Sequence, residues 1–174
     1  KLMSDQNTDI AIALRKKAWK RIIRAAIFLG IAGAIIYGVV LLAEGEKPQG
    51  EDRSRAVPIL GQEHIPETVT VTTYNSNPPT SGPHFATPTR VGFYARALPD
   101  ERLVHNLEHG DIWISYKPAV PDSAKEALRA LTSDLKVVVT LREKNDTDIA
   151  LAAWGRVDTF DLENGGLDLE RIQD

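Results

Sequence analysis

Three residues that could do acid–base or metal chemistry stand close together in the segment ERLVHNLEHGDIW, residues 101–113: His105, Glu108 and His109. Histidines four positions apart lie one turn apart on a helix, with side chains about 5–6 Å from each other, and can present two nitrogens to one metal ion. In a strand the same two residues would lie roughly 13 Å apart, too far to share an ion. The conformation of this segment therefore decides whether a shared site can exist.

Local features favour a helix over residues 100–109. Asp100 follows Pro99 and can cap the first turn, and Gly110 stands where a left-handed residue would end the helix. At about 100° per residue, the aliphatic residues of the segment lie on one side: Leu103, Val104 and Leu107. The opposite side carries the residues capable of chemistry: Glu101, His105, Glu108 and His109. The pattern predicts a helix that buries one face and presents imidazoles and carboxylates on the other.

The letters HNLEH also match the pattern H-x-x-E-H, in which two histidines bind zinc and the glutamate is the general base. Glu108 would be the base of such a metal-dependent hydrolase. Hydrolases of this pattern are far larger and need a further acidic ligand downstream, and no second motif here supplies one. We therefore expect no hydrolase activity. The plain alternative is a surface helix on which Glu108 pairs with Arg90 or Arg102.

A proline-rich loop, PPTSGPH at residues 78–84, supplies another candidate ligand, His84. Proline fixes the backbone direction, so the loop can hold this histidine at a set point. We expect His84, His105 and His109 to converge on one ion, with Glu108 as a fourth ligand or as an orienting group. Alternatively, His84 is a loop histidine that bonds a carbonyl. The chain has four histidines, and the remaining one, His64, is expected to be structural or on the surface.

The choice of metal follows from the ligand types. The chain has no cysteine and one methionine, Met3, so thiolate sites and soft sulfur ligands are excluded. Imidazole nitrogens and a carboxylate favour zinc or copper(II).

A membrane anchor is predicted before the domain. Residues 25–43 contain no charge over nineteen positions, a length of roughly 28 Å as a helix, and six Lys or Arg occupy the ten residues before them. That asymmetry predicts a single-pass helix in the cell membrane with a cytoplasmic amino terminus. A cleaved signal peptide and a buried core helix are the alternatives. The chain then divides into a basic cytoplasmic tail (1–24), the span, a polar linker (44–62) and an extracytoplasmic domain (63–174).

The remaining pattern predicts an α+β domain with a mixed or antiparallel sheet and two to three helices. Strands are expected at residues 68–74, 111–118, 136–143 and 149–160. Besides residues 100–109, helices are expected at residues 121–134 and 165–173. Acidic residues outnumber basic ones in this part, which argues against a nucleic-acid partner.

Three segments, YNSNPPTSGPHF, ERLVHNLEHGDIWISY and IALAAWGRV, closely resemble the bacterial and archaeal family catalogued as domain of unknown function 3105. The resemblance runs from about Gln62 to the end and implies a membrane-anchored or exported protein. Members of that family usually continue with an aromatic and basic tail, so we expect the chain to be incomplete at its carboxyl end. The signature segments contain the same four residues, His84, His105, Glu108 and His109.

Three functions remain open at the level of sequence. The first is a membrane-tethered domain that binds a divalent metal or serves as an accessory subunit of a membrane complex. The second is the metal-dependent hydrolase. In the third, no metal binds; His84, Glu108 and His109 join the loop to the helix through hydrogen bonds, and the function is partner binding.

Overall fold

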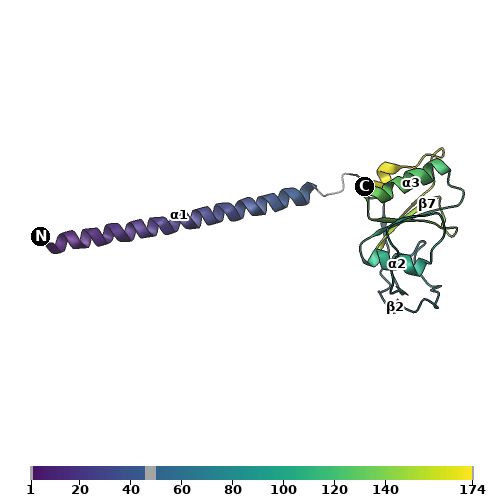
Figure 1. Ribbon diagram of the computed structural model, residues 1–174, viewed down its shortest axis with the longest axis horizontal. Helices are drawn as coiled ribbons and strands as arrows, with labels where there is room; N and C mark the ends of the chain where they lie inside the picture. Colours follow the sequence, from purple (N-terminus) through teal and green to yellow (C-terminus); the bar gives the residue numbers. More distant parts are fainter. Residues whose placement is uncertain (1, 46–49, 174) are drawn as a thin grey trace. The chain divides into compact units, whose positions relative to one another are not determined.

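The structure is a computed structural model that describes residues 2–45 and 50–173 (Figure 1). The chain divides into two compact units, residues 1–49 and 50–174. Residues 46–49 of the predicted linker lie outside the described residues.

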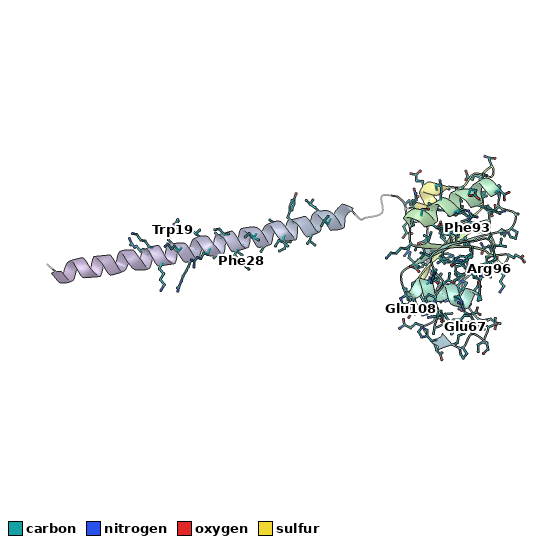
Figure 2. The ribbon with its side chains drawn as sticks, in the orientation of Figure 1. Trp19, Phe28, Glu67, Phe93, Arg96 and Glu108 are labelled. Carbon is teal, nitrogen blue, oxygen red and sulfur yellow. The ribbon has the colours of Figure 1, made fainter. Side chains whose placement is uncertain are left out.

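The first unit is one helix, α1 (Leu2–Gly45). Its stretch Arg15–Leu42 is long and apolar enough to cross a membrane by length and composition. Large apolar side chains such as Trp19 and Phe28 project from the helix and are exposed (Figure 2). The predicted span, residues 25–43, lies within this helix.

The second unit contains a six-stranded sheet in the order β1-β8-β7-β5-β6-β4. Strands β4 and β5 pair with β6 in parallel, whereas β5, β7, β8 and β1 pair antiparallel, so the sheet is mixed. The strands are β1 (Arg55–Ala56), β4 (Gly92–Tyr94), β5 (Ile112–Tyr116), β6 (Val137–Leu141), β7 (Ile149–Ala153) and β8 (Arg156–Phe160). Together with three helices, this confirms the predicted α+β class.

Two helices pack on opposite faces of the sheet, α2 (Asp100–Glu108) and α3 (Asp122–Asp134) (Figure 1). Alternation along β5 decides which helix meets which residue, because neighbouring side chains of a strand point to opposite faces. Trp113 packs with α2, in a cluster with Leu103 and Leu107, and Ile114 packs with α3. A short closing helix, α4 (Leu169–Gln173), confirms the third helix.

Some local expectations were wrong. Residues 68–74 form no strand; the backbone N–H of Val71 donates to the Glu101 carboxylate (2.8 Å) instead of to a neighbouring strand. The segment 149–160 is a hairpin of β7 and β8, turned at Gly155, whose φ is +70°.

The ends of α2 agree with the sequence at one end and differ at the other. Gly110 is left-handed (φ +84°), as expected after the last turn. Asp100 does not cap the helix: the N-cap position is Pro99, and no side chain caps it. The Asp100 carboxylate instead receives two hydrogen bonds from Arg142. The predicted cap residue therefore pairs with Arg142, which follows β6, instead of capping α2.

The compact unit begins at Gly50, within the segment assigned to the linker. We name residues 50–65 the strap. Its strand β1 pairs with β8, and beside it the Val57 backbone N–H donates to the Gly155 carbonyl (2.8 Å). The strap ends in β2 (His64–Ile65), which pairs in parallel with β3 (His84–Phe85) and places His64 beside His84.

Candidate metal centre

The proline-rich loop is fixed immediately before His84. The Tyr74 hydroxyl donates to the Pro83 carbonyl (2.7 Å). Burial, reinforced by Glu101 and Asp100, raises the pKa of Tyr74, so the hydroxyl keeps the proton that it donates. Gly82 has a φ of +119°, and a Cβ at this position would lie 3.1 Å from the Tyr74 ring. A glycine therefore lets the loop pass close to Tyr74 and aim His84 inward, where its side chain is fully buried.

The other half of the site comes from α2, and Asn106 holds that helix in place. Its amide nitrogen donates to the Thr89 carbonyl (2.7 Å) and to Asp111 (2.8 Å), and its oxygen accepts from the Thr89 backbone N–H (2.9 Å). The side chain is buried and its hydrogen-bonding capacity is used inside the protein. Sequence reasoning missed this residue; a buried amide within the histidine segment VHNLEHG was the available indication.

Four side chains meet between the loop, β2 and α2. One ligand atom from each of His64, His84, His105 and Glu108 lies within 4.8 Å of the others. Glu108 lies at the end of α2 (Figure 2), and its Oε2 is 3.1 Å from His84 Nε2 and 3.8 Å from His64 Nε2. Ligand atoms around tetrahedral zinc lie about 3.3 Å apart, given zinc–ligand bonds of about 2.0–2.1 Å. This group of three imidazoles and one carboxylate could therefore hold a metal ion after small side-chain movements.

The structure brings together three of the four residues expected from the sequence: His84, His105 and Glu108. His109 is not in the group; its Nε2 lies 2.9 Å from His105 Nε2, and the residue is exposed. His64 is in the group although its side chain is 52% exposed. It arrives there through the two-residue pairing of β2 with β3, a contact that leaves no pattern in the sequence.

The hydrogen bonds of His84 fix where its proton sits. Its Nδ1 lies 2.8 Å from the Gly82 carbonyl oxygen, which can only accept, so Nδ1 carries a hydrogen. This is the carbonyl bond that the sequence left as an alternative role for His84. In the neutral ring Nε2 then has a lone pair, and it faces a carboxylate oxygen at 3.1 Å. Two lone pairs at that distance repel, so the contact requires either a proton or a metal cation between the two atoms.

The environment of His105 disfavours protonation. Burial lowers the pKa of this imidazole, and His109, His84 and His64 lower it further because a charge on His105 would be repelled by charge on them. The backbone of Phe85 acts in the opposite direction. His105 Nδ1 is buried and has no hydrogen-bond partner among the described residues. The ring is therefore held in the neutral form, which is the form that binds metals.

A family model described as "Protein of unknown function (DUF3105)" matches residues 64–165, more than half of the chain. The chain belongs to the DUF3105 family. The match confirms the resemblance expected from the PPTSGPH and VHNLEHG segments. No curated protein and no solved structure matches.

The DUF3105 match runs from His64 in β2 through β8 and includes both halves of the site. The four residues His64, His84, His105 and Glu108 lie inside it, and so does His109. The family description names no reaction.

Proposed function

We propose that this protein is a membrane-anchored domain that binds one divalent transition-metal ion through His64, His84, His105 and Glu108. The observation that carries the proposal is the contact of His84 Nε2 with Glu108 Oε2 at 3.1 Å, in a ring whose other nitrogen already donates to Gly82. A metal ion between these atoms removes the repulsion and uses both lone pairs. His64 and His105 each offer a further nitrogen within 4.8 Å of the other ligand atoms.

The ligand types support zinc or copper(II). Imidazole and carboxylate suit both ions, and a chain without cysteine offers no thiolate to select copper(I). Three nitrogens and one oxygen fill a tetrahedral shell, which is the arrangement of closed zinc sites rather than of catalytic sites with an open position. With Glu108 bound to the ion, no carboxylate of the group is left as a general base. The proposed role is therefore binding, as an accessory part of a membrane complex, rather than hydrolysis.

The helix α1 supports the proposed location. Its apolar stretch has the length of a bilayer span, and the basic residues lie on its amino-terminal side. The excess of Lys and Arg on one side supports a cytoplasmic amino terminus and a domain outside the cytoplasm, in the cell membrane.

The same contact supports a second candidate function. If a proton rather than a metal lies between His84 and Glu108, the pair is a charge-assisted hydrogen bond that joins the proline-rich loop to α2. The site would then be structural, and the function would lie in partner binding.

Metal titration separates the two candidates. The full chain is purified in mild detergent without a histidine tag, and its affinity for zinc and copper(II) is measured by competition with a chromophoric chelator. We expect one ion per chain, and we expect Glu108→Gln and His105→Gln each to lower the affinity at least about tenfold. Glu63→Gln is the matched control, because Glu63 is an exposed carboxylate next to His64 and outside the group. If both ligand variants bind metal as tightly as the wild type, or if no stoichiometric binding is found, the metal site is refuted. The His84–Glu108 contact is then the proton-bridged structural pair.

A further inference from the structure

The strap, residues 50–65, is held to the domain by few contacts near its carboxyl end. From residue 58 to residue 64 every position is exposed, and the only buried residue of the strap is Val57. A few hydrogen bonds attach this end. The Leu60 N–H donates to Ser81 Oγ (3.0 Å), the Asn75 side-chain amide donates to the Pro58 carbonyl (2.6 Å), and the N–H groups of Gly82 and His84 donate to strap carbonyls (3.0 and 2.9 Å). A segment that is held by a few hydrogen bonds and buries little apolar surface of its own opens at low free-energy cost.

The metal-ligating group is divided between this strap and the rest of the domain. His64 lies on the strap, whereas His84 follows the proline-rich loop and His105 and Glu108 lie on α2. The His64 ring stacks on His105 with 5.2 Å between ring centres and meets the edge of His84 at 5.0 Å. An ion bound by all four residues would therefore cross-link the strap to the domain at the point where the strap is least buried.

We infer that metal binding locks the strap onto the domain, so that the strap is docked when the ion is bound and opens readily when it is not. This inference rests on the proposed function, because it assigns His64 as a ligand of the same ion. The strap is also the part of the domain that follows α1 in the chain. Occupancy of the site thus controls the order of the segment that leads from the membrane helix into the domain.

The size of the effect is fixed by thermodynamic reciprocity. A ligand shifts an equilibrium between docked and open strap by the ratio of its affinities for the two states. When the strap is open, His64 no longer contacts the ion. The metal affinity of the His64→Ala variant therefore measures the affinity of the open state. The factor by which metal lowers the equilibrium constant for strap opening should therefore equal the ratio of the dissociation constants of His64→Ala and the wild type. Loss of a supporting group at a metal site lowers affinity about 10–100-fold, and loss of a ligand should have at least this effect.

The test is hydrogen–deuterium exchange of the full chain in mild detergent, with and without saturating zinc. In the wild type, zinc should slow exchange of the Leu60, Gly82 and His84 amides at least about tenfold, because these three bonds break when the strap opens. His64→Ala, brought to saturation at higher zinc, should keep metal-free exchange rates at the same amides. His64→Asp should restore part of both affinity and protection, since a carboxylate can also bind zinc. Glu63→Ala, a neighbouring change in the strap, should behave as the wild type.

Two failures are distinguishable. If the wild type binds no zinc, the proposed function fails and this inference fails with it. If His64→Ala binds zinc as tightly as the wild type and zinc does not slow hydrogen exchange of the strap amides, His64 is not a ligand. The ion is then bound by the other three residues, and the proposed locking of the strap is wrong. Agreement between the affinity ratio and the protection ratio supports the inference.

Discussion

Replacing Asp100 with alanine should destabilise the domain far more than the same change at Asp122. The Asp100 carboxylate accepts from Arg142 Nε (3.0 Å) and Nη2 (2.9 Å), a bidentate pair whose side chains are only 17% and 8% exposed. The guanidinium also donates to Asn77 and Asn145 and lies over the Trp113 ring, so it cannot follow the lost carboxylate into water. Removing one partner of a buried pair leaves a buried charge and lowers the free energy of unfolding by about 3–5 kcal/mol.

Asp122 is a matched control. Like Asp100 it follows a proline, begins a helix and caps nothing with its side chain. Its ion pair with Lys125, at 3.0 Å, is on the surface, and its side chain is 96% exposed. Exposed pairs contribute about 0–1 kcal/mol. Both changes remove a negative charge near a helix amino terminus, so that contribution cancels in the comparison.

The assay is equilibrium unfolding of the full chain by guanidinium chloride in mild detergent, followed by tryptophan fluorescence. Trp113 is fully buried next to Arg142 and reports the loss of the core. We expect the two variants to differ by at least about 2 kcal/mol, given the ranges for buried and exposed pairs. Equal losses, or a loss below about 1 kcal/mol for Asp100→Ala, would refute the assignment of the Arg142 pair as a buried interaction that ties α2 to the residue following β6.

Two further predictions concern pH and topology. Because burial and neighbouring imidazoles lower the pKa of His105, this group binds more protons in the unfolded than in the folded metal-free chain below about pH 6.5, and the stability that it contributes should fall as the pH falls from that value. The change in unfolding free energy from pH 7 to pH 5.5 should therefore be less favourable in the wild type than in His105→Gln; an equal change in both proteins would contradict this role of His105. Protease added to intact cells should digest the domain after α1, whereas complete protection until the cells are permeabilised would reverse the proposed orientation.

Elements with their own periodic pattern could be predicted from the sequence. The spacing of Leu103 and Leu107 predicted α2, and Gly110 predicted its end. Both signals depend on residues within one or two helical turns of each other. The runs VVVT and IWISY gave β6 and β5 for the same reason. The uncharged residues 25–43 predicted a helix, and in the structure α1 extends beyond them on both sides, from Leu2 to Gly45. These features depend on local geometry and side-chain type, which the sequence states directly.

Residues whose role depends on a distant partner could not be assigned in this way. Asp100 has the sequence of a helix cap, but Arg142 lies forty-two positions away and takes its carboxylate. Residues 68–74 alternate like a strand, but an alternating segment becomes one only if a neighbour offers a free edge, and Val71 meets Glu101 instead.

The residues of the site also differ in whether a local pattern or a distant contact places them there. His84, His105 and Glu108 could be selected from the sequence, because helical spacing and a proline-rich loop mark them locally. His64 joins them only through the pairing of β2 with β3 across twenty positions, and His109 stands beside the group although it has the helical spacing of a ligand. Sequence by itself determined which residue types and which helix could bind a metal. The tertiary structure decided which nitrogens meet, because strand pairing and loop closure bring together atoms that no short-range pattern connects.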